Sequence, residues 1–186
     1  MPKYYMLECY GPDEVDRAGI ARVEGLDGVN WMLGQRFRQP IPSSIRITLD
    51  ADDGIMMPMF NSGILLFSDE LISALHQAGV SNLDLYDCVL TNPKTNATYD
   101  TYKAANILGL VAAADMANSK YQAHTGLVAD VDFESVVIDE SRTHNLLMFR
   151  LAECVSGIVV HEHVKNVVDA NRIPYLDWVD PSEWVG

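Results

Sequence analysis

Cysteine is scarce in this sequence, and long apolar runs are missing from it. The three cysteines, Cys9, Cys88 and Cys154, are far apart and odd in number, so they suit neither a disulfide framework nor a zinc-ligand spacing. No segment approaches the roughly 18 apolar residues that span a bilayer, and the first residues lack the apolar run of a secretory signal. We therefore expect buried free thiols, no membrane partner and a cytoplasmic location.

Basic residues are also in short supply. Lysine and arginine total 13 against 26 aspartates and glutamates, which gives a formal net charge of −13 at pH 7. A field of this sign repels the phosphates of nucleic acids and attracts basic proteins. Arginines gather between residues 17 and 46, whereas residues 50–100 and 130–183 are acidic. We expect no nucleic-acid partner. The acidic segments indicate either a solvated face that aids solubility or a surface for a basic protein.

Catalytic motifs are absent. The twelve glycines are scattered singly, so the sequence has no nucleophile elbow, phosphate-binding loop or dinucleotide fingerprint. His161 and His163 could meet one metal ion from a strand, and a metal-dependent hydrolase built on them is an alternative function. A third ligand is not evident near them. We expect no metal, no cofactor and no catalytic residue, and hence no enzymatic activity.

Two segments about 90 residues apart, 59–87 and 148–180, share one pattern. In the first, residues 64–67 form an apolar run that is typical of a buried strand, and Ser68 stands where it can cap a helix. Gly79 supplies a residue that can end this helix in the left-handed conformation. Period-two alternation resumes at residues 83–86. The apolar stripe of the helix consists of Leu71, Ile72, Leu75 and Ala78.

The second segment repeats these features. Glu162 lies in the first turn of its helix and Asn171 can terminate it, with an apolar stripe of Val164, Val167 and Val168. An alignment of the two segments requires a shift of one residue near the helix. Each segment is therefore predicted as strand, short helix, strand. We expect an α+β fold with a mixed β-sheet, short helices and an internal strand-helix-strand duplication, in a single domain that covers residues 1–186.

Outside the two segments the local structure is less uniform. Residues 4–10 and 45–50 have the composition and alternation of strands, and residues 135–138 are predicted as a strand with a solvated acidic edge. Residues 30–34 form an apolar anchor within a region of loops. The alanine-rich segment 102–118 suits either a helix or a buried strand, and its periodicity does not separate the two.

Two acidic groups are candidate contacts with a protein partner. Aromatic residues rimmed by carboxylates are good interface anchors, and the C-terminal stretch has this composition. The first group is Asp177, Trp178, Asp180, Glu183 and Trp184. The second group is Asp130, Asp132 and Glu134. A final strand that packs its tryptophans into the core is the alternative interpretation of the first group, and a solvated strand edge is that of the second.

The arrangement of these segments resembles a known protein family. The elements that carry the resemblance are residues 30–34, 63–86, 102–111 with Asp115 and Ser119, and 148–151 with the second repeat. Together they are similar to the eleventh immunity-protein family of bacterial polymorphic toxin systems, which was first catalogued as a domain of unknown function. The resemblance covers most of residues 30–180.

This resemblance implies a cytosolic bacterial protein that binds and neutralises a cognate toxin. It implies no catalytic residues. Acidic inhibitors suit toxins that attack nucleic acids, because such enzymes have a basic substrate cleft that an inhibitor can cover. We therefore expect a basic toxin domain as the partner. A generic regulatory module that binds other proteins is a further alternative.

Overall fold

The computed structural model describes residues 3–12, 16–26, 28–50, 54–124 and 131–186. Strands predominate over two short α-helices, so the expected α+β class is confirmed. In chain order the elements are β1 (Tyr4–Glu8), β2 (Ile20–Glu24), β3 (Ile45–Leu49), β4 (Met59–Ser62), β5 (Ile64–Ser68), α1 (Asp69–Gln77), β6 (Leu83–Thr91), β7 (Thr98–Tyr99), β8 (Tyr102–Ile107), β9 (Leu110–Val111), β10 (Lys120–Ala123), β11 (Val131–Ser135), the 3-10 helix η1 (Glu140–Arg142), β12 (Met148–Leu151), β13 (Ile158–His161), α2 (Glu162–Ala170), β14 (Asp177–Val179) and the 3-10 helix η2 (Pro181–Glu183).

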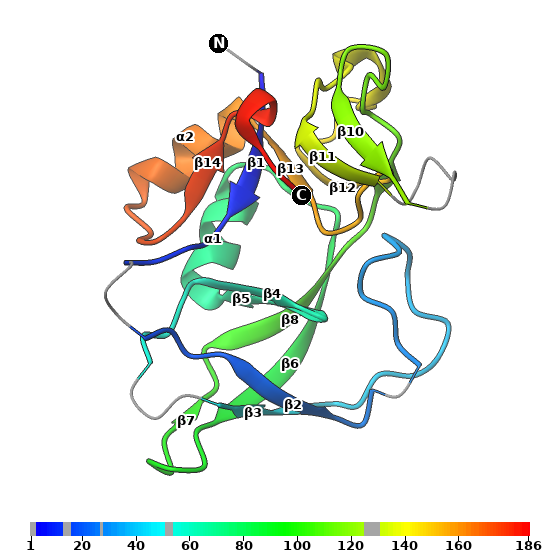
Figure 1. The fold of residues 1–186 in the computed structure, drawn as a ribbon. Helices are drawn as coiled ribbons and strands as arrows, with labels where there is room; N and C mark the ends of the chain where they lie inside the picture. Colours follow the sequence, from blue (N-terminus) through cyan, green and yellow to red (C-terminus); the bar gives the residue numbers. More distant parts are fainter. Residues whose placement is uncertain (1–2, 13–15, 27, 51–53, 125–130) are drawn as a thin grey trace.

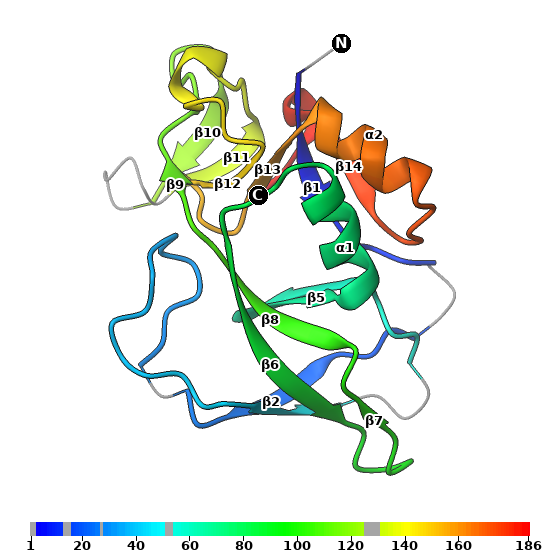
Figure 2. The same cartoon turned by 180° about the vertical axis from the view of Figure 1, so that it is seen from behind.

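The strands form two large sheets and one hairpin. The first sheet has the order β14-β1-β13-β12-β9, and the second has the order β2-β3-β6-β8-β5-β4, with β7 paired to β6. The pairs β3–β6 and β9–β12 are parallel, and the remaining pairs are antiparallel, so the sheets are mixed as expected. The hairpin consists of β10 and β11. The helices α1 and α2 lie side by side and next to both sheets (Figures 1 and 2).

The apolar core has three parts. A central cluster joins both sheets to both helices, and the stripe positions predicted from the sequence, Leu71, Leu75, Val164 and Val168, are all buried in it. A second cluster contains Trp31 of the anchor at residues 30–34, which covers the other face of the second sheet. A third cluster lies between the first sheet, β11 and the C-terminal residues. Both faces of each sheet are therefore covered, which removes apolar side chains from water.

The two predicted segments have the same order of elements. The first unit is β4, β5, α1 and β6, and the second unit is β12, β13, α2 and β14. In each unit one further antiparallel strand lies between the strands that flank the helix. This strand is β8 in the first unit, where it follows β6 in the chain, and β1 in the second unit, where it precedes all other elements. A common origin of the two units stays a prediction.

From the N-caps Ser68 and His161 to the ends of the helices, the two units correspond at a separation of 93 positions. The helices α1 and α2 end at Ala78 and Asn171. The helices themselves need no shift, whereas Gly63 and Gly157 before them are 94 positions apart, so the expected shift of one residue falls in the strands that precede the helices. The apolar runs of β5 and β13 are too uniform to show which residue faces the helix. Only the strand pairing, Phe67 with Met59 and Val160 with Met148, sets the register.

The two units contact each other through their first hairpins. The Arg150 guanidinium of β12 donates from Nη1 to the Val155 carbonyl at 2.8 Å and from Nη2 to Asn61 Oδ1 at 3.5 Å. Asn61 of β4 in turn donates from Nδ2 to the Ser156 carbonyl at 3.2 Å. Arg150 is buried, and this burial lowers its pKa to about 10. The contact fixes the hairpin of one unit against that of the other.

Two expectations about local structure are now settled. The segment 102–118, which suited a helix or a strand, forms the strands β8 and β9 and then a turn. The predicted strand at residues 135–138 is wrong, because the strand β11 ends at Ser135 and only Ile138 makes an isolated bridge, to Ala114. Among the residues that the structure describes, no helix has both the length and the apolar character needed to cross a bilayer.

Candidate protein-binding surface

The C-terminal segment lies against β11 (Figure 1). Phe133 and Gly186 exchange two backbone hydrogen bonds, of 2.6 and 3.1 Å, and the Val136 N–H donates to the Pro181 carbonyl at 2.9 Å. The two acidic groups predicted from the sequence are 40 or more positions apart in the chain, as the positions of Glu134 and Asp177 show. The fold therefore brings together two groups that the sequence offered as alternatives.

Carboxylates at least partly exposed to solvent lie on or beside four elements, β11, η1, β14 and η2. Val131 and Phe133 of β11 are buried, so the alternation of the strand leaves Asp132 and Glu134 exposed. On η2, Pro181 is buried and Glu183 is exposed. We define the acidic surface by Asp132, Glu134, Glu140, Asp177, Asp180 and Glu183. Asp130 lies outside the described residues.

The two tryptophans of the predicted anchor differ. Trp184 is 3% exposed, and its indole Nε1 donates to Glu8 Oε1 at 2.7 Å, so the expectation that it anchors a partner is wrong. It packs near Phe133 in the third core cluster, as the alternative interpretation predicted. The C-terminal segment turns back onto β11, and this return buries the indole. Trp178 is half-buried, and its Nε1 donates to Asp169 Oδ1 at 2.8 Å.

Glu8 adds negative charge beneath this surface. It lies on β1 opposite Asp177 of β14. Burial raises its pKa, the nearby Asp177 raises it further, and the hydrogen bond from Trp184 acts in the opposite direction. The Asp177 carboxylate also accepts from the Tyr10 N–H at 3.4 Å. The edge formed by β1 and β14 therefore holds carboxylates close enough to repel one another.

A groove of about 200 Å³ lies between η1 and η2. Residues 136–138 form its apolar floor, Glu140 of η1 stands on one side, and Asp180 at the start of η2 stands on the other. Lys3 also lines the groove, with its Nζ 3.7 Å from Glu140 Oε2. Val137 is 38% exposed, which is unusual for a valine and makes the floor accessible.

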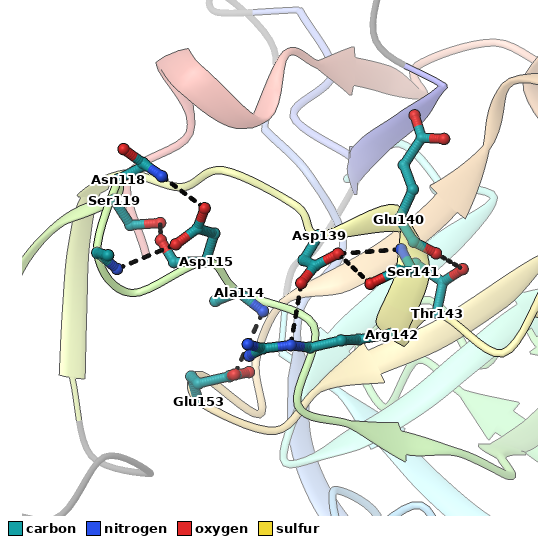
Figure 3. Close-up of polar contacts among 11 residues, drawn as sticks. Ala114, Asp115, Asn118, Ser119, Asp139, Glu140, Ser141, Arg142, Thr143 and Glu153 are labelled. Carbon is teal, nitrogen blue, oxygen red and sulfur yellow. Dashed lines mark hydrogen bonds and ion pairs between the residues drawn. The ribbon is translucent and has the colours of Figure 1, made fainter.

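Polar contacts within η1 hold the Glu140 side of the groove (Figure 3). Asp139 accepts from the Ser141 N–H at 3.0 Å and from its hydroxyl at 2.6 Å, and its other oxygen is 3.0 Å from Arg142 Nε. These bonds lower the pKa of Asp139, those from Ser141 most strongly. Thr143 is buried, donates to the Glu140 carbonyl at 2.9 Å and accepts from the Tyr4 hydroxyl at 2.9 Å.

The floor of the groove is held by the turn that follows β9 (Figure 3). The Val137 N–H donates to Ser119 Oγ at 2.9 Å, and the Val137 carbonyl accepts from the Asp115 N–H at 2.8 Å. Ser119 in turn donates to the Asp115 carbonyl at 2.7 Å. Asp115 and Ser119 carry part of the family resemblance, and here they position the backbone of Val137.

Glu153 fixes the start of the same turn from below. It is buried, and its Oε1 accepts from the Ala114 N–H at 3.2 Å (Figure 3). Burial raises the pKa of Glu153, while the backbone N–H groups of Glu153 and Ala114 and the charge of Arg142 lower it. The hydrogen bond from Ala114 therefore holds a buried carboxylate against the turn, and this carboxylate is not part of the surface.

The histidine pair considered for metal binding has a structural role. His161 is the N-cap of α2, and its Nδ1 accepts from the His163 N–H at 3.0 Å, as Ser68 Oγ accepts from Leu71 in α1. The lone pair that would bind a metal at Nδ1 is therefore used. Across the described part of the chain, no three histidine, cysteine or acidic side chains are grouped so that they could hold a metal ion.

Two of the three thiols, those of Cys9 and Cys88, are poor nucleophiles. The three cysteines are free, Cys88 is buried, and Cys9 and Cys154 are half-buried. Burial raises the pKa of Cys88 to about 12 and that of Cys9 to about 11. Both thiols stay protonated at neutral pH, and the thiol is far less nucleophilic than the thiolate.

Arg17 of the arginine-rich segment lies near Asp177, because its guanidinium donates to the Tyr10 carbonyl and the Tyr10 N–H donates to Asp177. Other arginines of the segment have partners elsewhere. Arg46 pairs with Glu24 at 3.1 Å, and Arg36 lies 3.7 Å from Asp84 of the first unit. Residues 28–39 surround a cavity of about 420 Å³ lined by Arg36, Phe37 and Arg38. None of these residues lies on β11, β14, η1 or η2, whereas His124 lies 2.6 Å from Asp132 and Lys3 lies 3.7 Å from Glu140.

Some members of this surface were not among the contacts predicted from the sequence. These members are Glu140 and the neighbouring residues Glu8, Lys3 and Val137. The tertiary fold brings them to Asp177 and Asp180, and no spacing in the chain indicates it. Comparison with known proteins finds no family model that matches the chain and no significant match among curated sequences.

Proposed function

We propose that this protein is an immunity protein, which binds a basic bacterial toxin in the cytosol and masks it. The observation that carries the proposal is the acidic surface, because the packing of the C-terminal segment on β11 brings two acidic segments from separate parts of the chain near each other. The resemblance noted in the sequence supplies the role of toxin immunity. The proposed activity is binding, and no catalytic step is assigned to any residue.

The charge of the surface supports a basic partner. A toxin that attacks nucleic acid has a cleft lined by lysine and arginine, which binds the phosphates of its substrate. A carboxylate-rich surface is attracted to such a cleft, and this attraction accelerates association at low salt. An inhibitor must also hold the toxin tightly, so we expect a dissociation constant of roughly 1 nM or less.

Co-expression tests the role directly. The toxin domain encoded beside this protein is expressed in a sensitive host, with and without this chain. We expect survival only when this chain is present. Equal killing in both cultures, with the chain soluble and abundant, would contradict the proposal for that toxin.

Association kinetics with a catalytically inactive form of the toxin test the surface. The variant Glu134→Gln, Asp177→Asn, Glu183→Gln removes three charges from the acidic surface. The control variant Asp16→Asn, Glu70→Gln, Asp100→Asn removes three charges from exposed positions outside it. We expect the first variant to associate about tenfold more slowly at low salt and the control to change by less than about twofold. Equal effects would show that only net charge matters.

A further inference from the structure

We propose that the groove between η1 and η2 binds a lysine or arginine side chain of the partner. The inference rests on the proposed function for the identity of the partner, and it adds the place and the kind of side chain that this partner inserts. It follows from the shape of the groove, from the charges on its sides and from an ion pair that the protein already makes there.

The groove suits a side chain with an apolar stem and a charged end. Its floor is apolar, and Val137 is accessible from outside. Glu140 and Asp180 stand on its two sides. Lysine and arginine bury their methylene groups on apolar surface while their charged ends stay at its rim. A neutral apolar side chain would leave the two carboxylates without a partner, and an acidic one would be repelled.

Lys3 shows that a cation is accepted at this position. Its Nζ lies 3.7 Å from Glu140 Oε2, which is close enough for an ion pair but too far for a hydrogen bond. The Lys3 backbone is held by α2, because its carbonyl accepts from the Glu162 N–H at 2.7 Å. Its side chain is 47% exposed. The ammonium therefore occupies the rim loosely, and a partner side chain that approaches more closely can replace it.

The carboxylates of Asp180 and Glu140 both have oxygens that can accept further hydrogen bonds. Asp180 uses Oδ1 to cap η2, accepting from the Ser182 N–H at 2.9 Å and its hydroxyl at 2.7 Å. No described residue donates to Asp180 Oδ2 or to the carboxylate of Glu140. Hydrogen bonds between an ionised donor and an ionised acceptor are the stronger ones, so a cation that hydrogen-bonds to either carboxylate gains more than Lys3 does.

A fragment titration tests the groove without the toxin. Methyl resonances of Val136, Val137 and Ile138 are followed by NMR while N-acetyl-lysine methylamide or the uncharged N-acetyl-norleucine methylamide is added. We expect a saturable shift centred on Val137 with the lysine fragment and about fivefold weaker binding of the norleucine fragment. Equal responses to the two fragments, no response, or shifts of similar size over the whole acidic surface would overturn the proposal.

Three variants sharpen this titration. Glu140→Gln with Asp180→Asn removes both charges but keeps the oxygen that caps η2, and we expect about tenfold weaker binding of the lysine fragment. Lys3→Ala removes the internal competitor and should strengthen binding about twofold. Asp177→Asn is the control, since its side chain does not line the groove. An unchanged affinity in the first variant, or an equal loss in the control, would overturn the proposal.

Binding of the inactive toxin then distinguishes the groove inference from the proposed function. Val137→Lys places a cation of the protein's own in the groove, and we expect it to increase the dissociation rate of the complex at least about tenfold. Val137→Thr, of similar size and uncharged, is the matched control. If the wild-type protein binds the toxin and both variants bind it equally well, the groove inference is wrong and the proposed function stands. If the wild-type protein does not bind, the proposed function fails for that toxin, and the fragment titration still decides the groove.

Discussion

The two units of this protein share a scaffold but use equivalent positions differently. Asp84 of β6 and Asp177 of β14 are equivalent, 93 positions apart. Asp84 lies 3.7 Å from Arg36, so the segment 28–39, outside the first unit, provides a cation for this carboxylate. Asp177 lies beside Glu8, which raises the local negative charge. The carboxylate of the first unit is therefore paired with a cation elsewhere in the chain, whereas that of the second unit lies beside another carboxylate.

The strands that follow the helices show the same difference. β6 runs on to Thr91 and pairs with β3 at Cys88 and beyond. The equivalent residues of the second unit form η2, which packs on β11 and presents Asp180 and Glu183. A longer strand extends the sheet of the first unit, while a short helix makes a surface in the second. The comparison indicates that the first unit extends its sheet and that the proposed binding surface lies next to the end of the second unit.

The largest expected effect concerns the shared core. Leu75 and Val168 are equivalent, and both are buried in the central cluster. Leu75→Ala removes more apolar volume, so we expect it to lower the free energy of unfolding by about 3 kcal/mol, against about 2 kcal/mol for Val168→Ala. Urea unfolding measures both values. Two separate transitions in either variant would break the comparison, because the cluster should make both units unfold together.

The helix caps provide the next test. Ser68→Ala and His161→Ala each remove a side chain that accepts from the first turn, and we expect each to cost about 1 kcal/mol at pH 8. Burial lowers the pKa of His161 below 6.5, and the charges of Lys3 and His163 lower it further. The carboxylates of Glu162 and Glu140 raise it, but by less. The unfolded chain therefore binds the proton more readily, and stability falls as the pH drops through about 6.5.

This pH dependence separates the two caps. A protonated His161 Nδ1 can no longer accept from the His163 N–H, so the cost of His161→Ala should shrink as the pH falls from 8 to 5, whereas the cost of Ser68→Ala should not change in this way. Urea unfolding at the two pH values gives both differences. A cost of His161→Ala that is the same at pH 5 and pH 8 would contradict the role of the ring nitrogen.

The residues after the helices differ in a smaller way. Gly79 and Arg172 both have positive φ angles, of 87° and 56°. This conformation strains residues other than glycine, so Gly79→Ala should cost about 1 kcal/mol and Arg172→Gly should stabilise by about 0.5 kcal/mol. Thermal unfolding of the two variants tests the opposite signs. A loss of stability in Arg172→Gly would show that its side chain makes a contribution that the comparison overlooks.

The smallest expected effects are those of the equivalent aspartates. Asp84→Asn breaks an exposed ion pair and should cost no more than about 0.5 kcal/mol, whereas Asp177→Asn relieves repulsion and should stabilise by a similar amount. The pKa of Glu8 should fall in Asp177→Asn, because that charge raises it. NMR titration of Glu8 measures this change. The same sign for both substitutions would contradict the division of roles between the units.

Much of the local structure was predictable from the sequence. The strand at residues 45–50, the cap at Ser68 and the end of α1 before Gly79 are confirmed as β3 and α1. These features depend on neighbouring residues, through alternation, capping and the freedom of glycine. The segment 102–118 was ambiguous because alanine favours a helix, whereas β8 is held as a strand by its pairing with β5 and β6.

The candidate site was predictable only in part. Most of the carboxylates could be named from the sequence because acidic residues are numerous near them, yet it could not be predicted that the fold brings their segments together. These residues are Asp132, Glu134, Asp177, Asp180 and Glu183. The exposure of Trp184 was predicted wrongly, because its burial depends on the return of the chain to β11, which no local pattern shows. The groove required Lys3, Val137, Glu140 and Asp180 together, and these residues come from distant parts of the chain.

The sequence by itself determined the charge, the two helices and the strands around them, because these depend on composition and on contacts within a few residues. Only the tertiary structure decided that β1 and β8 complete the two units, that two acidic segments meet on one surface, and that a groove lies between η1 and η2. Such features depend on the pairing and packing of residues far apart in the chain. The free energy that selects them comes from the whole core, and no local window of the sequence contains it.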